Sequence, residues 1–152
     1  MTNNHTIEKI GLRWGLITLL LLGAYFIIMK IFGLIHTPEL RVLNAFIMFY
    51  GVFQSVKSAK LELEDFNYFK GFGVGALTAF STSFTYSLAG VIYITFIDPA
   101  FMASIQANEP LGLFMNEYSA SLQIFIEGSA SGILFSYASL QWLRTPYLAG
   151  GN

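Results

Sequence analysis

The sequence predicts an all-α protein: a four-helix transmembrane bundle with a short amphipathic helix on its outer surface between the third and fourth spans. Three observations support this prediction. Of the 152 residues, 55% are hydrophobic and only 11% are charged, whereas a soluble domain carries roughly 25% charged residues. The mean hydropathy is +0.59. Four stretches approach the roughly 20 apolar residues that a spanning helix needs. We therefore expect a single domain over residues 1–152, solvated by lipid.

The expected spans are residues 12–34, 40–56, 71–97 and 121–143. The first two are joined by the short segment GLIHTPEL, so these helices should pack as antiparallel neighbours. Within that segment, Thr37-Pro38 is typical of a helix cap followed by a first-turn proline. A soluble helical core is disfavoured because the stretches are apolar all round rather than along one stripe.

The distribution of basic residues predicts the orientation. Six of the eight Lys and Arg residues flank the same ends of the expected spans: Lys9, Arg13, Lys57, Lys60, Lys70 and Arg144. Basic residues favour the cytoplasmic side, so both termini should be cytoplasmic and residues 98–119 should face outward. The link KSAKLELEDFNYFK between the second and third spans either lies at the membrane interface or is a solvated loop.

The outward segment should contain a helix of its own. Asp98-Pro99 is typical of an N-cap followed by a proline at the first helical position. Phe101, Met102 and Ile105 then share one face. Because a residue before proline is disfavoured in a helix, Glu109-Pro110 should end the element. We expect a short amphipathic helix over residues 99–107 on the outer surface.

Two charges fall inside expected spans, Lys30 in the first and Glu127 in the fourth. Each lies 17 positions from a basic residue expected at the inner interface, Arg13 and Arg144 respectively, which is about 25 Å along a helix. Both charges should therefore lie at the same depth, near the outer edge. An isolated charge costs about 2.5–3.5 kcal/mol at mid-membrane and less at this depth, and pairing relieves that cost, so we expect a Lys30–Glu127 ion pair. Alternatively, Lys30 reaches the headgroups without a partner.

Polar and small residues accompany Glu127. Gln123, Glu127 and Ser131 follow at intervals of four and form a polar stripe on one helix face. The remaining candidates are Asn44, expected to be buried and hydrogen-bonded, and the expected helix-contact glycines Gly75, Gly128 and Gly132. Such residues ordinarily pack helices together, with hydroxyls bonded to their own backbone. The alternatives are an outward-open polar pocket with Glu127 as its charged group, or a contact face for another protein.

Several classes of chemistry lack the residues they need. The chain has no cysteine, which excludes disulfides and thiolate chemistry, and His5 and His36 are not in a metal-ligand spacing. No phosphate loop or Ser-His-Asp set occurs. The net charge of −1 provides no basic field for nucleic acid. We expect no catalytic residue, metal or cofactor, and a protein that is not an enzyme.

The segment FNYFKGFGVGALTAFSTSFTYSLAGVIYITFIDPAF resembles the domain of unknown function 4199 family. The similar features are the Phe-rich entry ending in Lys70-Gly71, the long third span containing a tyrosine, and the closing residues 97–101, IDPAF. The resemblance implies a four-span protein of the bacterial inner membrane. It carries no activity and supplies no catalytic residues.

Two functions remain as hypotheses. The first is a non-catalytic accessory or assembly subunit that binds another inner-membrane protein or forms a homo-oligomer in contact with membrane lipid. The second is a small carrier or lipid-binding protein with a polar outer-leaflet pocket around Glu127. The intramembrane charge supports the second hypothesis, because such residues commonly mark functional sites.

Overall fold

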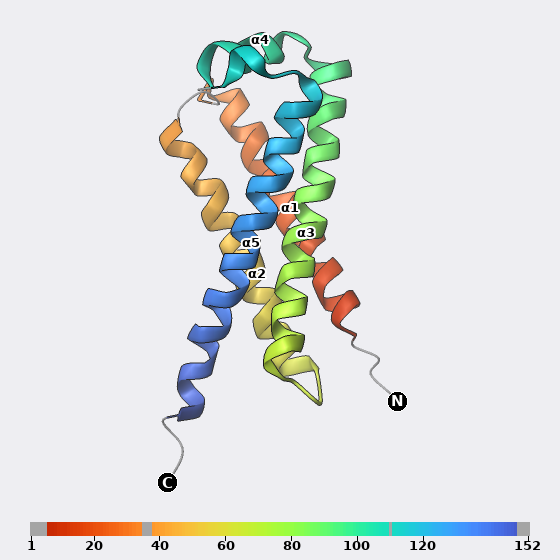
Figure 1. The fold of residues 1–152 in the computed structure, drawn as a ribbon, viewed down its shortest axis with the longest axis vertical. Helices are drawn as coiled ribbons and strands as arrows, with labels where there is room; N and C mark the ends of the chain where they lie inside the picture. The colour runs from red at the N-terminus through yellow and green to blue at the C-terminus, as the bar shows by residue number, and fades with distance from the viewer. Residues whose placement is uncertain (1–5, 35–37, 110, 149–152) are drawn as a thin grey trace.

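The computed structural model describes residues 6–34, 38–109 and 111–148, which form five α-helices and no strand (Figure 1). The helices are α1 (Ile7–Ile31), α2 (Pro38–Glu62), α3 (Tyr68–Ile92), α4 (Ala100–Asn108) and α5 (Glu117–Leu148). A π-helical turn, η1 (Tyr93–Ile97), extends α3, and a 3₁₀ turn, η2 (Gly112–Phe114), precedes α5. The prediction of an all-α protein is confirmed for these residues.

Local sequence accounts for where the helices begin and end. The side chain of Asn67 accepts a hydrogen bond from Lys70 N at 2.9 Å and so caps the start of α3. At the end of α1, Gly33 has φ of +68°, a left-handed conformation that glycine adopts without strain. Leu34 N then donates to Met29 O at 2.9 Å and Gly33 N to Lys30 O at 3.1 Å. This Schellman motif satisfies carbonyls that the helix end leaves open.

The elements between the expected spans differ from the predictions in detail. The short helix expected over residues 99–107 is α4, which begins at Ala100 with Pro99 at its N-cap position. The backbone of Phe101, in its first turn, hydrogen-bonds to the carboxylate of Asp98, as expected of a capping side chain. The segment between α2 and α3 holds no separate helix, because α2 continues to Glu62 and α3 begins at Tyr68. Proline is the first residue of α2, as expected, and Thr37 lies outside the described residues.

The four long helices α1, α2, α3 and α5 lie side by side, with α4 across one end (Figure 1). Helix α1 packs against α2 and α3, and α5 packs against the same two helices. Consequently α1 and α5 occupy opposite corners of the arrangement. The first residues of α1, the link between α2 and α3, and the last residues of α5 all lie at the end remote from α4.

Small and hydroxylated residues fill the interior, whereas most large apolar side chains face outward. The side chains with the least exposure are Ile10, Val52, Val56, Val74, Thr18, Thr78, Thr82, Ser55, Ser121, Ser136 and Ser139. Among the described residues, two helices are long and apolar enough to cross a membrane, Ile7–Ile31 and the continuous Tyr68–Ile97. In each, only 17% of the most apolar window is buried, unlike the core helix of a soluble protein. The other two expected spans lie within α2 and α5.

Candidate functional site

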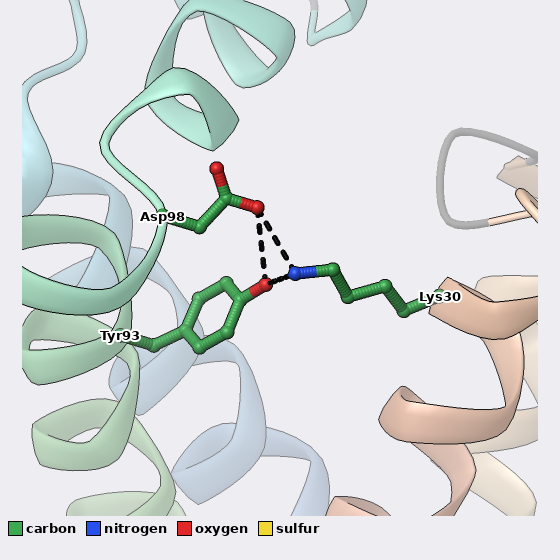
Figure 2. Close-up of polar contacts among 3 residues, drawn as sticks. All are labelled: Lys30, Tyr93 and Asp98. Atoms are coloured by element: carbon green, nitrogen blue, oxygen red, sulfur yellow. Dashed lines mark hydrogen bonds and ion pairs between the residues drawn. The ribbon is translucent and has the colours of Figure 1, made fainter.

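A polar cluster joins α1 to the end of α3 at the end of the molecule that carries α4. Lys30 Nζ lies 3.0 Å from Asp98 Oδ2 and also donates to the Tyr93 hydroxyl. That hydroxyl in turn donates to Asp98 Oδ2 at 3.2 Å. Figure 2 shows the three side chains converging between the two helices. We call Lys30, Tyr93 and Asp98 the outer-end cluster, after the end of the molecule that the sequence predicts to face outward.

The π turn η1 brings two members of this cluster together. Asp98 N donates to Tyr93 O at 2.9 Å, a bond between residues five apart that defines the π turn. The turn places the carboxylate of Asp98 beside the ring of Tyr93, where both meet the ammonium of Lys30. The carboxylate therefore binds Lys30 of α1 in addition to its hydrogen bond with the backbone of Phe101 in α4.

Aromatic packing supports the same region. The rings of Phe26, Tyr93 and Phe101 contact one another edge to face, with centroid distances of 5.2, 5.8 and 6.0 Å. These distances lie in the favourable range for aromatic pairs. Because Phe101 belongs to α4, the three rings connect α1, η1 and α4 at one point.

The ammonium of Lys30 donates to Asp98 and lowers the pKa of that carboxyl below its ordinary value, with a smaller contribution from the Tyr93 hydroxyl. Partial burial acts in the opposite direction and is weaker. Because the folded-state pKa is depressed, the contact stabilises the fold above the ordinary pKa of aspartate and is lost as the pH falls through the lowered value. The outer-end cluster should therefore stay intact at neutral and mildly acidic pH.

Replacing Lys30 with methionine should return the pKa of Asp98 towards the ordinary value, because the largest cause of the shift is removed. An NMR titration of the ¹³C-labelled Asp98 carboxyl would report the change as a higher titration midpoint. Lys57→Met is the control, since Lys57 is exposed near the C-terminal end of α2, remote from Asp98. Equal midpoints in wild type and Lys30→Met would show that the ammonium does not act on Asp98.

The predicted Lys30–Glu127 pair is wrong, because each side chain has another partner. Lys30 binds Asp98 and Tyr93, whereas Glu127 Oε1 accepts a hydrogen bond from Gln123 Nε2 at 2.7 Å. The two charges belong to helices at opposite corners of the molecule.

The predicted equal depth is wrong as well. Lys30 is the penultimate residue of α1. Gly128, next to Glu127, lies against Ser83, which precedes Asp98 by 15 positions, or about 22 Å along a helix. Arg144 was a poor reference because α5 is a single helix of 32 residues, about 48 Å long and longer than the hydrocarbon thickness of about 30 Å. Glu127 lies well below the outer-end cluster.

The residues of the polar stripe and Asn44 lie in different environments. Gln123 and Glu127 are joined, with Glu127 exposed, and Ser131 is half-buried on the same helix. Asn44 on α2 is half-buried, and its Oδ1 has no hydrogen-bond partner within the described part of the chain. Among the described residues, the hydrogen bond expected for Asn44 is thus not found at Oδ1.

The three candidate glycines lie where α3 and α5 approach each other. A Cβ atom added to Gly132 would be 1.9 Å from Ala79 Cβ, and one added to Gly128 would be 2.3 Å from Ser83 Oγ. On α3, a Cβ on Gly75 would be 2.5 Å from Ser136 Oγ. Real Cβ atoms do not approach so closely, so these positions require glycine at this helix spacing.

Sequence reasoning missed a second close contact, between α1 and α3. The hydroxyl of Thr78 reaches Gly11 O at 3.2 Å, and that of Thr82 reaches Gly15 O at 3.0 Å; each also lies within bonding distance of a carbonyl in its own helix. Both pairs are spaced four residues apart, so GLRWG at residues 11–15 was a visible signal of the contact.

The end of the molecule remote from α4 carries its own contacts, which the sequence analysis does not predict. Arg13 Nη2 pairs with Glu62 Oε1 at 2.7 Å, and Trp14 Nε1 donates to Ser58 Oγ at 2.9 Å. Both bonds join the beginning of α1 to the last part of α2. No local pattern within either helix indicates such a pairing.

One cavity of about 340 Å³ opens between α3 and α5 and is lined by Ala76, Leu77, Phe80, Ser129 and Ile133. Its lining is almost entirely apolar, and Glu127 is not part of it. Within residues 6–34, 38–109 and 111–148, no group of three or more His, Cys, Asp or Glu side chains is arranged to hold a metal ion.

Comparison with protein families gives one match, over residues 13–138, to the family described as protein of unknown function (DUF4199). The match covers most of the chain. The chain belongs to the DUF4199 family. The resemblance inferred from the sequence is confirmed. No curated protein and no solved structure matches the chain.

Proposed function

We propose that this DUF4199 chain is an integral protein of the bacterial inner membrane that crosses the bilayer four times and acts as a non-catalytic accessory or assembly subunit. In this proposal α1, α2, α3 and α5 are the spans, and α4 lies on the outer surface. The chain binds another membrane protein through the face of α5 that carries Gln123 and Glu127.

Immersion in lipid is supported by the positions of the ion pairs. On α1, Arg13 belongs to one pair and Lys30 to the other, and the 17 positions between them correspond to about 25 Å. This spacing approaches the hydrocarbon thickness of about 30 Å. Large apolar side chains on all four long helices are exposed between those levels, among them Leu20, Phe46, Phe84 and Ile126.

The orientation follows from the basic residues. Five basic residues lie towards the start of α1, the end of α2 or the start of α3: Lys9, Arg13, Lys57, Lys60 and Lys70. These helix ends are remote from α4 (Figure 1). No Lys or Arg occurs from residue 71 to residue 143. An excess of Lys and Arg marks the cytoplasmic side, so α4 faces outward in this proposal. The first residues of α1 and the last residues of α5 are then cytoplasmic.

The observation that carries the docking function is the exposed carboxylate of Glu127. Glu127 is five positions before Gly132, which contacts α3; at about 100° per residue, its side chain points about 140° away from that contact. It is exposed, and its hydrogen bond is to Gln123 on its own helix. A charge facing hydrocarbon costs about 2.5–3.5 kcal/mol at mid-membrane and less towards an interface, and Glu127 lies closer to the level of Arg13 than to that of Lys30. A partner that covers this face with a hydrogen-bond donor or a cation offsets what remains of that cost.

The competing lipid-carrier hypothesis places Glu127 in a polar outer pocket. Two observations weigh against it: the cavity between α3 and α5 is apolar and excludes Glu127, and Glu127 lies far below the outer-end cluster. In the accessory-subunit hypothesis, the partner binds the carboxylate where it lies, on the face of α5 that points away from the contact with α3.

The test combines site-specific crosslinking with purification from native membranes in mild detergent. A photoreactive amino acid at Ala130, exposed beside Glu127, should crosslink a stoichiometric membrane protein; the same probe at Phe84 on α3 should not. The crosslink should be lost in Glu127→Leu and retained in Glu64→Gln, an exposed acid in the α2–α3 link. Recovery of phospholipid alone, with no crosslinked protein, would favour the lipid-binding alternative and refute the subunit function.

A further inference from the structure

The segment that leads into α5 presents bulky apolar side chains to the outside. Leu111, Leu113 and Phe114 are 63%, 85% and 87% exposed. No charged residue occurs from Leu111 to Asn116. Single exposed apolar residues are ordinary on a protein surface, but a group of this kind marks a surface that another phase or molecule covers.

The segment is built rigidly, so these side chains are held outward. Phe114 N donates to Leu111 O at 3.0 Å and Met115 N to Gly112 O at 2.9 Å, which closes the turn η2. Gly112 is buried against the end of α4, where a Cβ atom would lie 2.5 Å from Ile105 O. The side chain of Gln106 also donates to Met115 O at 3.1 Å.

The platform beneath η2 is fixed to the long helices. Ile94, Met102 and Ala120 form a buried cluster that joins η1, α4 and α5, and Met115 packs against it. The start of α5 is capped by reciprocal bonds of 2.8 Å: Ser119 N to Asn116 Oδ1, and Asn116 N to Ser119 Oγ. The position of η2 is therefore tied to the outer ends of α3 and α5.

The surroundings indicate what covers the exposed group. The membrane-crossing candidate Tyr68–Ile97 ends with Phe96 and Ile97, which are 78% and 66% exposed, immediately before Asp98 of the outer-end cluster. Figure 1 places α4 and the start of α5 at this same end. The apolar outside of α3 thus continues to the level at which η2 lies. Tyr118, also largely exposed, is of the type enriched at membrane interfaces.

We propose that Leu111, Leu113 and Phe114 insert into the boundary between headgroups and acyl chains of the outer leaflet, so that η2 is a surface anchor on the lipid bilayer. Apolar side chains of an interfacial segment reach about 5–10 Å into this boundary. The proposal rests on the membrane crossing in the proposed function and is independent of any protein partner. The anchor would hold α4 flat across the outer ends of the helices.

The absence of cysteine allows single spin labels to measure depth. Variants Leu113→Cys and Phe114→Cys, both at exposed side chains, are labelled with a nitroxide and reconstituted in vesicles of phosphatidylethanolamine and phosphatidylglycerol. The ratio of accessibility to oxygen over accessibility to a water-soluble nickel complex should be several-fold higher at both positions than at Asn108→Cys. Asn108 is the matched control, because it is an exposed polar residue at the end of α4.

The label at Phe84→Cys separates the two proposals. Phe84 is exposed in the middle of the apolar run of α3. If its label is shielded from nickel while labels at 113 and 114 are as open to nickel as the label at 108, the anchor is refuted and the membrane crossing stands. If the label at 84 is itself open to nickel, the crossing by α3 fails, and the anchor fails with it.

Discussion

Replacing Gly132 with alanine should destabilise the protein by about 1–3 kcal/mol, the usual cost of overpacking a close contact. The new Cβ atom would lie 1.9 Å from Ala79 Cβ and 3.3 Å from Ala79 Cα. Neither neighbour is the end of a flexible side chain, so α3 and α5 must separate. This separation outweighs the gain in helix propensity, which favours alanine over glycine by roughly 1 kcal/mol.

The double variant Ala79→Gly/Gly132→Ala should recover most of the lost stability. It transfers one methyl group from α3 to α5 and keeps one glycine and one alanine at the contact, so propensity effects cancel. Unfolding by denaturing detergent from mild-detergent micelles measures both variants. Gly73→Ala on α3 is the control, because nothing lies within 4 Å of a Cβ at that position. A double variant no more stable than Gly132→Ala would mean that this contact does not set the helix spacing.

Replacing Gly51 with alanine should produce a loss of similar size at a different interface, also about 1–3 kcal/mol. A Cβ atom on Gly51 of α2 would lie 1.8 Å from Thr18 Oγ1 of α1. The hydroxyl of Thr18 is buried and bonded to Trp14 O at 2.7 Å, so it has little freedom to withdraw. The added methyl must push α1 and α2 apart.

Thr18→Gly should relieve Gly51→Ala, since it removes the atoms that the new methyl meets. Gly23→Ala is the control on α1, with open space around its Cβ. Because Gly51 and Gly132 act on separate helix pairs, their losses should add when both substitutions are combined. A combined loss far below the sum would indicate that one opening of the helices accommodates both methyl groups.

Local sequence was sufficient for the helices and for part of their packing. Asn67 before α3 and Gly33 after α1 act within one helical turn, so their roles are visible in a short window. Gly128 and Gly132 reveal a contact face because a spacing of four returns to the same side of a helix. The same rule would have identified Gly11 and Gly15, whose carbonyls accept from the threonines of α3.

The candidate charges show where such reasoning ends. Equal counts along two helices predict the Lys30–Glu127 pair, but those two helices do not pack against each other. The local pattern predicts the contact of Asp98 with the first turn of α4, but it does not predict that the π turn presents the same carboxylate to Lys30. The partner of a charged side chain depends on which helix packs beside it and on the relative heights of the two helices. Residue spacing within one helix gives neither the neighbouring helix nor its height.

From sequence alone, then, came the helical class, the four long apolar stretches, the short helix between the last two, the family and the small-residue contact face. The helices and the contact face depend on hydrogen bonds and side-chain periodicity within a few turns of one helix, so a short stretch of sequence is enough to predict them. The folded molecule was needed to establish that α1 and α5 lie at opposite corners, that Lys30 pairs with Asp98, and that the carboxylate of Glu127 points away from the contact with α3. Each of these depends on contacts between segments distant in the chain, whose relative heights and rotations are settled only when all the helices pack together.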